Sequence, residues 1–240
     1  MQSARIKDFG QWFSQSKTDV PNKNYCHVLL IEDVTKRAGT LSDLQAYVKQ
    51  AHEPARQHLL QPFNESLHPA GSKPMVDPSA GYPEMLDDIT LQGYFGEIFS
   101  GIIAEHCEHN NSSNWEVPAY LFHTHDVAFQ ELEKMKQGQP SKRIFGRTGD
   151  DCLAFERDKS GKISRVMVCE AKLTQNHNAN LIKENHAKLS DGFGVPVHVA
   201  RVIEALKYLP QDTYTKNWIC LLYTSPSPRD QRGSRMPSSA

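Results

Sequence analysis

Two apolar runs on either side of a short polar turn constrain the fold of this chain more than any other feature. The runs are CLAFER (152–157) and ISRVMVCEAK (163–172), and the sequence DKSG (158–161) separates them. Apolar runs flanking a Gly-containing turn are typical of a β-hairpin. Because side chains alternate along a strand, Glu170 and Lys172 are predicted to lie on the same face.

A long amphipathic pattern at 86–107 predicts a helix. One stripe of this helix is apolar and consists of Leu91, Phe95, Ile98, Phe99, Ile102 and Ile103. A second stripe carries small residues, namely Gly93, Ser100, Gly101 and Ala104. Glu97 lies within the second stripe. Since small residues allow a close approach between backbones, we expect the Glu97 carboxylate to be held near a sheet rather than in bulk water.

Short apolar runs alternate with helical patterns elsewhere in the chain, which indicates an α/β protein. Further strands are predicted at 25–32, as a buried strand, and at 117–122. Further helices are predicted at 41–52 with Thr40 as N-cap, and at 53–60, 126–136, 180–189 and 197–209. We expect a small mixed β-sheet flanked by helices at 84–219, preceded by an N-terminal α/β appendage at 1–83.

Two carboxylates are expected to meet at one end of the predicted hairpin. Asp151 opens the first strand, with Leu153 and Phe155 on its face, and Glu170 lies near the end of the second. Neighbouring carboxylates resist joint ionisation, and a divalent cation relieves their repulsion. Asp150 is the alternative to Asp151, because a shift of one residue moves a side chain to the other face.

The pair of carboxylates suits Mg²⁺, which prefers oxygen ligands and often uses one or two carboxylates together with substrate phosphate. Such an ion polarises a phosphodiester and acidifies an attacking water. Lys172 can orient that water or stabilise developing negative charge. Glu97 would complete the cluster from the helix.

Three pieces of sequence stand in an order that resembles the PD-(D/E)XK nuclease superfamily. They are GYFGEIFSGIIAEH with Glu97, GRTGDDCLAF with Asp151, and RVMVCEAK with Glu170 and Lys172. The resemblance covers 86–189 and implies a restriction-endonuclease-like core, dependence on Mg²⁺ or Mn²⁺, and phosphodiester hydrolysis, with DNA favoured as substrate. The proline of the family name is absent, and Gly149-Asp150 stands in its place.

The helix sequence before this core is also similar to the nuclease subunit of Hachiman-type anti-phage defence systems. That similarity implies a role in defence and a helicase as partner. Lys142, Arg143 and Arg147 precede the first strand of the hairpin and are candidates for phosphate contacts, with a solvated loop as the alternative.

Other functions remain open at this point. The nuclease-like fold could bind nucleic acid or a partner helicase without cutting. A zinc hydrolase built on His123 and His125 is a third hypothesis, although the sequence HTHD lacks a matching downstream ligand set. Glu170 and Lys172 could also form an ordinary exposed ion pair at a strand end.

Composition restricts partners and location. The formal net charge of the 240-residue chain is −1, so nucleic-acid binding would depend on a local basic patch. The chain has no apolar run long enough to cross a membrane and no apolar signal core, which predicts a cytoplasmic protein without membrane contact. Its five cysteines lack CxxC spacing and fit a reduced compartment, with a Cys152–Cys169 disulfide as the alternative.

The last residues break from the composition of the rest. Residues 220–230 can be back-translated into a string that looks like a transposase-type sequencing adaptor, and 235–240 into the end of the same adaptor family. We therefore expect 220–240 to be adaptor-derived and to take no part in the fold, with the native sequence interrupted near Trp218. The alternative is a genuine disordered tail.

Overall fold

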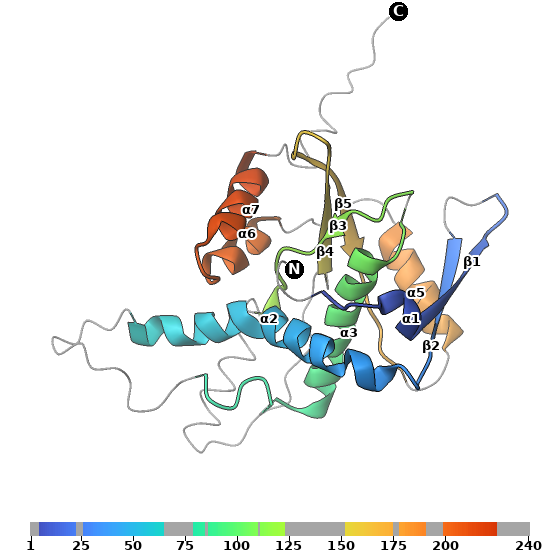
Figure 1. Cartoon of the computed structure of the whole chain (residues 1–240), viewed down its shortest axis with the longest axis horizontal. Coiled ribbons are helices and arrows are strands. Elements are labelled where there is room, and N and C mark those ends of the chain that lie inside the picture. Colours follow the sequence, from blue (N-terminus) through green and yellow to red (C-terminus); the bar gives the residue numbers. More distant parts are fainter. Residues whose placement is uncertain are drawn as a thin grey trace, which may run out of the picture.

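The computed structural model describes residues 5–22, 26–64, 79–84, 86–109, 111–122, 152–174, 178–190 and 199–224 (Figure 1). Its elements in chain order are α1 (Phe9–Trp12), β1 (Phe13–Asp19), β2 (Cys26–Glu32), α2 (Arg37–Asn64), α3 (Asp88–His106), β3 (Trp115–Glu116), β4 (Cys152–Arg157), β5 (Ile163–Cys169), α5 (Ala179–Ser190), α6 (Val199–Lys207) and α7 (Thr213–Thr224). None of the helices in these ranges is long and apolar enough to span a bilayer.

Two small sheets flanked by helices confirm the α/β class. One sheet has the strand order β3-β4-β5, and the other pairs β1 with β2. All the described strand pairs are antiparallel, whereas a mixed sheet was predicted. The tight turn between β4 and β5 requires that pair to be antiparallel, since a parallel pair needs a long crossover connection.

The β4–β5 hairpin is confirmed. Cys152 pairs with Cys169, and Phe155 pairs with Val166. At the turn, Asp158 donates its backbone N–H to the Lys162 carbonyl, and Gly161 has φ of 82°. Glycine adopts that left-handed conformation without the steric cost that a Cβ would bring. The turn thereby fixes which residues of the two strands face each other.

The β3–β4–β5 sheet separates two cores. Cys152 and Ala154 face the first core with α3, and Leu153 and Phe155 face the second core with α6 and α7. Figure 1 shows α3 on one side of the sheet and α6 and α7 on the other. The alternation of side chains along β4 therefore fills both cores from a single strand.

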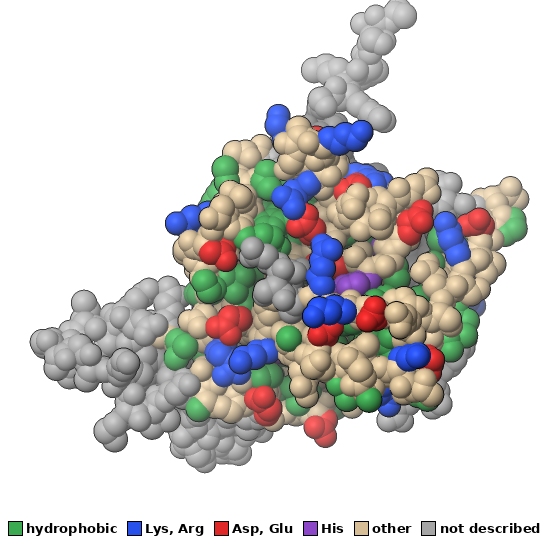
Figure 2. Space-filling model, viewed as in Figure 1, with side chains coloured by type: hydrophobic (Ala, Val, Ile, Leu, Met, Phe, Trp, Pro, Cys, Tyr) green, Lys and Arg blue, Asp and Glu red, His purple; other side chains and the backbone are tan. Residues whose placement is uncertain are grey.

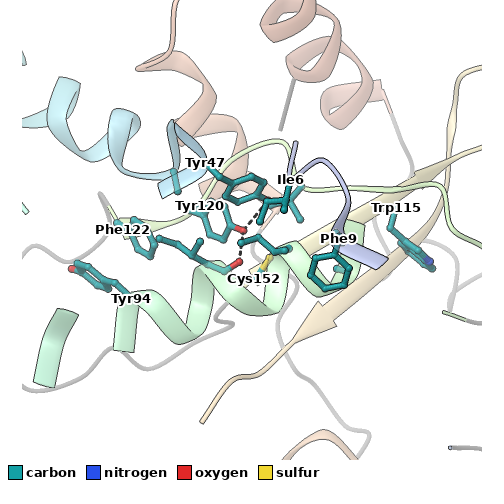
Figure 3. Packing of buried hydrophobic residues seen from close by; sticks show 14 of the residues in the cluster. Ile6, Phe9, Tyr47, Tyr94, Trp115, Tyr120, Phe122 and Cys152 are labelled. Carbon is teal, nitrogen blue, oxygen red and sulfur yellow. Dashed lines mark hydrogen bonds between the residues drawn. The ribbon is translucent and has the colours of Figure 1, made fainter. Parts of the chain in front are cut away.

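Helix α3 is the centre of the first core, and its prediction is confirmed. The Asp87 side chain caps its first turn by accepting from the backbone N–H groups of Ile89 and Thr90, each at 3.0 Å. Figure 3 shows Tyr120 and Cys152 packed against this helix, with the Tyr120 hydroxyl donating to the Ile98 carbonyl at 2.9 Å. The close packing fits the predicted stripe of small residues.

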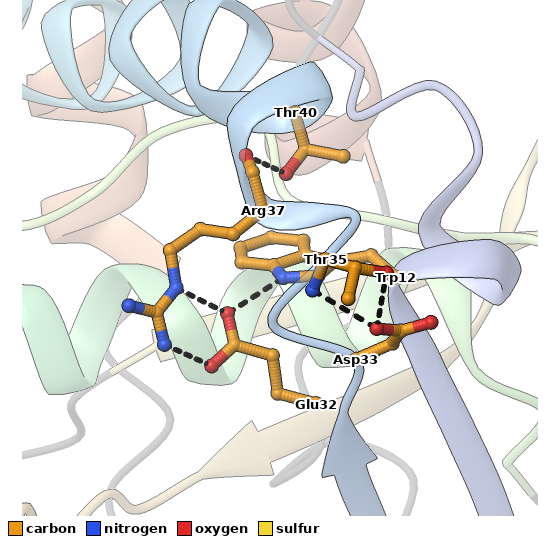
Figure 4. Close-up of polar contacts among 6 residues, drawn as sticks. All are labelled: Trp12, Glu32, Asp33, Thr35, Arg37 and Thr40. Atoms are coloured by element: carbon orange, nitrogen blue, oxygen red, sulfur yellow. Dashed lines mark hydrogen bonds and ion pairs between the residues drawn. The ribbon is translucent and has the colours of Figure 1, made fainter.

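The N-terminal region packs into the same core as α3. Its contributing side chains include Phe9, Trp12, Tyr47 and Ala51. Glu32 joins β2 to α2 by accepting from Trp12 Nε1 at 2.8 Å and from Arg37 Nε at 2.8 Å (Figure 4). The hydrogen bond from Arg37 is the largest cause that lowers the pKa of Glu32 to about 2.

Helix α2 differs from the prediction of two shorter helices. It is continuous through Pro54, although an interior proline loses one hydrogen bond and costs about 3 kcal/mol. Ala51 and Ala55 are buried on either side of Pro54, so packing of both halves offsets that cost. Thr40 is not an N-cap, because it lies within the helix and its hydroxyl donates to the Arg37 carbonyl.

The predicted strand at 25–32 is present as β2, but its predicted burial is wrong. Leu29 is 59% exposed and Ile31 is 56% exposed. Among the strands that the structure describes, β2 pairs with β1 alone, and of its apolar side chains Leu30 packs against the first core. Successive side chains point to opposite faces, so Leu29 and Ile31 face away from that core.

The predicted strand at 117–122 is also wrong. The sheet holds only the preceding residues, Trp115–Glu116, as β3, although all six residues from 117 to 122 are buried. The Val117 N–H donates to Glu105 Oε1 at 2.9 Å, and Pro118 has no N–H. The segment therefore lacks two donors that a strand ladder would use.

The C-terminal helices at 180–189 and 197–209 are confirmed as α5 and α6. Helix α7 extends to Thr224, and Leu222 is 5% exposed within the second core. This differs from the expectation that residues from 220 onward take no part in the fold. The predicted helix at 126–136 and residues 225–240 lie outside the described residues.

Candidate active site

The structure brings together the ends of the Glu170 and Lys172 side chains. Lys172 Nζ donates to Glu170 Oε1 at 2.6 Å. Strand β5 ends at Cys169, so both residues lie just beyond the strand that was predicted to contain them. The contact nevertheless agrees with the prediction that the two side chains share a face.

Exposure differs sharply between the two partners. The Glu170 side chain is 4% exposed, whereas that of Lys172 is 44% exposed. Burial of a carboxylate is costly unless hydrogen bonds and opposite charge compensate it. A carboxylate held out of water beside an accessible ammonium differs from the ordinary exposed ion pair that was the alternative interpretation.

Glu97 is buried in the middle of α3, as the sequence predicted, with 8% exposure. Burial is the main cause that raises the pKa of the Tyr82 phenol well above its usual range, and the Glu97 carboxylate adds to that shift. A hydrogen bond to Cys169 and burial raise the pKa of the Cys152 thiol, and Glu97 again contributes. The Glu97 carboxylate therefore lies within electrostatic range of Tyr82 and of the first residue of β4.

Helix α3 and the segment that carries Glu170 and Lys172 meet at Gly96. A Cβ placed on Gly96 would lie 3.6 Å from the Cβ of Ala171 and 3.8 Å from the Cβ of Leu173. These are ordinary van der Waals contacts. Glu97 follows Gly96 in the chain and Ala171 lies between Glu170 and Lys172, so the backbones of the two motifs are adjacent.

The glycines in the predicted stripe of small residues differ in how closely other parts of the chain approach them. A Cβ on Gly101 would lie 2.0 Å from the Tyr120 hydroxyl and 3.2 Å from Cys152 Sγ, so only glycine fits there. A Cβ on Gly93 would meet nothing within 4 Å. The close approach is therefore at Gly96 and Gly101, and Gly93 takes no part in it.

The pairing of Cys152 with Cys169 places the start of β4 opposite the end of β5. Glu170 directly follows Cys169, and residue 151 directly precedes Cys152. Both thiols are free. Asp150 and Asp151 lie outside the described residues, as do Lys142, Arg143, Arg147 and the two histidines His123 and His125.

The described part of the chain contains no group of three or more Asp, Glu, His or Cys side chains that could hold a metal ion. Glu97 and Glu170 therefore do not form such a site by themselves. A metal centre here would need a further ligand, and Asp151 or Asp150 is the candidate that the sequence offers. The donors fit Mg²⁺ in kind, because carboxylate oxygens are the ligands it prefers.

Basic and acidic side chains are interspersed on the surface that Figure 2 shows. Arg157 pairs with Glu116, and Arg165 pairs with Glu156. These pairs spread charge over the outer edge of the sheet. The face in Figure 2 therefore offers no continuous basic patch within the described residues, and Lys172 is the cation that contacts the candidate ligand Glu170.

Sequence reasoning missed a buried polar pair beside Glu97. His52 Nδ1 and the Tyr82 hydroxyl are 3.0 Å apart, and the His52 ring stacks on Phe122 with centroids 4.6 Å apart. His52 lies in α2 and Tyr82 precedes α3, so no local spacing links them. The apolar stripe of α3, which includes Leu91 and Phe95, indicated that this helix packs against another element, but it did not indicate His52 or Tyr82.

Comparison with known proteins adds no identification: no family model, curated protein or solved structure matches this chain.

Proposed function

We propose that this protein is a Mg²⁺-dependent nuclease that hydrolyses phosphodiester bonds, with DNA favoured over RNA. The observation that carries the proposal is the 2.6 Å contact between Lys172 Nζ and the nearly buried carboxylate of Glu170 at the end of the hairpin. A Glu-x-Lys pair of this kind supplies a metal ligand and a cation at the same point. The resemblance to the PD-(D/E)XK superfamily supports the same conclusion.

In the proposed mechanism Glu170 and Asp151 hold the metal, with Asp150 as the alternative to Asp151. When bound, Mg²⁺ would polarise the scissile phosphate and acidify a water. Glu170 presents its carboxylate in a site where little bulk water competes for it. Glu97 supports the centre from α3, which passes so close to the segment carrying Glu170 and Lys172 that a Cβ added to Gly96 would lie 3.6 Å from the Cβ of Ala171.

Lys172 is proposed to orient the attacking water and to stabilise the negative charge that develops on the phosphate. Its ammonium group carries three donors, and the hydrogen bond to Glu170 uses one of them. Because the side chain is 44% exposed, substrate can approach it from solvent.

The test is cleavage of supercoiled plasmid DNA with Mg²⁺ and with EDTA. Lys172→Ala should lower the Mg²⁺-dependent rate by about 100-fold or more, the range expected when a group that acts on the transition state is lost. Lys207→Ala on α6 is the matched control, since Lys207 is an exposed lysine on the other side of the sheet. Equal cleavage by wild type and Lys172→Ala would contradict the proposal.

The alternative hypothesis is a nuclease-like module that binds nucleic acid without cutting it. Binding of DNA without Mg²⁺-dependent cleavage would support this alternative. Binding that survives Glu170→Gln would then support a role in presenting nucleic acid to a partner such as a helicase. Zinc in the purified protein, measured by elemental analysis, together with loss of activity in His123→Ala would favour the hydrolase alternative.

A further inference from the structure

A groove runs between α2 and α3 and ends at the candidate active site. It consists of two adjoining cavities of about 380 and 430 Å³, which share four lining residues. These shared residues are Val48, His52, Pro83 and Phe95. The volumes fall in the range of small-ligand sites in proteins.

The walls of the groove are apolar, and one of them is aromatic. Val48 lines one side from α2, and Leu91 and Phe95 line the other side from α3. Phe95 is 39% exposed, which is unusual for an aromatic ring beside a core. Phe99 stacks against this ring with the centroids 5.8 Å apart, and the part of the ring left exposed offers a flat surface on which another aromatic ring can stack.

His52 gives the groove a polar but uncharged contact. Burial is the main cause that lowers the pKa of His52 to about 4, so its ring is neutral near pH 7. Its Nδ1 is engaged with the Tyr82 hydroxyl, and one face of its ring is stacked on Phe122. His52 therefore brings no positive charge to the groove near pH 7.

The rim of the groove is polar. Gln45 and Gln92 bring amide groups that can both donate and accept hydrogen bonds. Lys49 lies on the same rim and could meet a phosphate, while Glu84 and Asp88 repel one. Arg56 also lines the groove, where its Nη2 donates to the Tyr82 carbonyl at 2.5 Å.

The groove reaches the candidate catalytic pair through Leu173. Leu173 lines the groove and is 53% exposed. It follows Lys172 directly, and its Cβ would lie 3.8 Å from a Cβ on Gly96. A ligand in the groove would therefore lie beside the residues proposed to act on the phosphate.

We propose that this groove binds an unstacked nucleobase of a single-stranded nucleic acid. A base offers the flat ring that Phe95 can stack on and the hydrogen-bonding edge that amide side chains can pair with. Bases within a duplex are stacked and paired and cannot enter such a groove. This inference rests on the proposed nuclease function and defines its substrate as single-stranded or locally unpaired.

The test measures binding by the 240-residue wild-type chain in EDTA, so that no metal-dependent cleavage interferes. The probe is a short single-stranded DNA with one 2-aminopurine, whose fluorescence changes when the base leaves its stack. Phe95→Ala should weaken binding by about 5- to 150-fold, the loss expected for one stacked base. Phe95→Tyr retains a ring and should bind within about 3-fold of wild type on the same basis.

Ile89→Ala is the matched control. Ile89 is an apolar residue of α3 that is 63% exposed and does not line the groove, so its loss should leave binding unchanged. A thermal melt of each variant in the same buffer shows whether the fold is intact. Equal binding by wild type and Phe95→Ala would overturn the inference, as would equal affinity for the matching duplex.

The two proposals fail in different ways. Cleavage that depends on Lys172 but is unchanged in Phe95→Ala would overturn the base-binding groove and keep the nuclease. Base binding that depends on Phe95, in a protein that cuts nothing with Mg²⁺, would keep the groove and overturn the nuclease.

Discussion

At the scale of single residues, the pair formed by Glu170 and Lys172 is unusual in the unequal burial of its partners. Breaking a fully buried ion pair costs about 3–5 kcal/mol, because a charge is left without compensation. Lys172→Ala leaves the Glu170 carboxylate, whose side chain is 4% exposed, without this partner, so the loss of stability should approach that range. A thermal melt of Lys172→Ala therefore accompanies the cleavage assay, and the rates are compared at a temperature at which the variant is folded.

His52 provides a second prediction at the residue scale, on the pH dependence of stability. Burial and the nearby charge of Arg56 lower its pKa from 6.5 to about 4. The unfolded chain therefore binds a proton at a higher pH than the folded chain does. The free energy of unfolding should fall as the pH decreases from about 6.5 to about 4, by about 3 kcal/mol if the whole shift is realised.

Urea unfolding at a series of pH values measures this dependence. His52→Phe keeps a ring that can stack on Phe122 but cannot take up a proton, so its unfolding free energy should change less across that window. His27→Phe changes an exposed histidine of β2 and should keep the wild-type dependence. An unchanged slope in His52→Phe would show that other groups are responsible.

At the scale of elements, α3 makes opposite predictions for two of its glycines. Gly101→Ala places a methyl group 2.0 Å from the Tyr120 hydroxyl, which is held by its bond to Ile98. We expect a loss of about 1–3 kcal/mol from overpacking. Gly93→Ala meets nothing within 4 Å and should gain up to about 1 kcal/mol from helix propensity.

Chemical unfolding of both variants checks these signs. The substitution is the same and both positions lie inside α3, so propensity alone would change the two stabilities equally. A stable Gly101→Ala variant would mean that α3 does not approach Tyr120 and Cys152 this closely.

Elements with local signals could be predicted from the sequence. The β4–β5 hairpin follows from alternation around a Gly-containing turn, and α3 follows from its apolar stripe. Elements whose form depends on contacts with residues far away in the sequence could not be predicted in this way. Helix α2 passes through Pro54 because Ala51 and Ala55 are buried, and residues 117–122 are buried without joining the sheet because Glu105 takes the Val117 N–H.

The candidate site was predictable to the same extent. Alternation predicted that Glu170 and Lys172 share a face, although both lie just beyond the end of β5, and the small-residue stripe predicted that Glu97 is held near the sheet. The contact of Gly96 with Ala171 brings together residues far apart in the chain, and no local period indicates it. The groove forms only where α2 and α3 lie side by side, and the sequence does not predict that arrangement. From the sequence alone, Phe95 is therefore interpreted as an ordinary member of the apolar stripe.

At the scale of the whole molecule, one sheet carries both cores, and the C-terminal helix closes the second core. Leu222 is 5% exposed there, whereas the neighbouring Tyr223 is 62% exposed. Leu222→Ala should cost about 2–5 kcal/mol as a large-to-small change in a core. Tyr223→Ala should stay within about 0.5 kcal/mol of wild type, as surface substitutions usually do.

Thermal or urea unfolding of these two variants tests whether residues 220–224 belong to the fold. Equal, small effects would agree with the expectation from the sequence that this segment is adaptor-derived and plays no structural part. A large effect of Leu222→Ala alone would agree with the place of α7 in the second core, where its Trp218 ring packs against Phe155.

The central claim is that the buried carboxylate of Glu170, with Lys172 beside it, forms a metal-dependent phosphodiesterase centre. The most direct measurement is the single-turnover cleavage rate of DNA as Mg²⁺ is titrated, in wild type, Glu170→Gln and the exposed control Glu204→Gln. We predict that wild type and Glu204→Gln saturate with Mg²⁺, and that Glu170→Gln is slower by about 100-fold or more. A Glu170→Gln variant that cuts at the wild-type rate, with the same dependence on Mg²⁺, would contradict the claim.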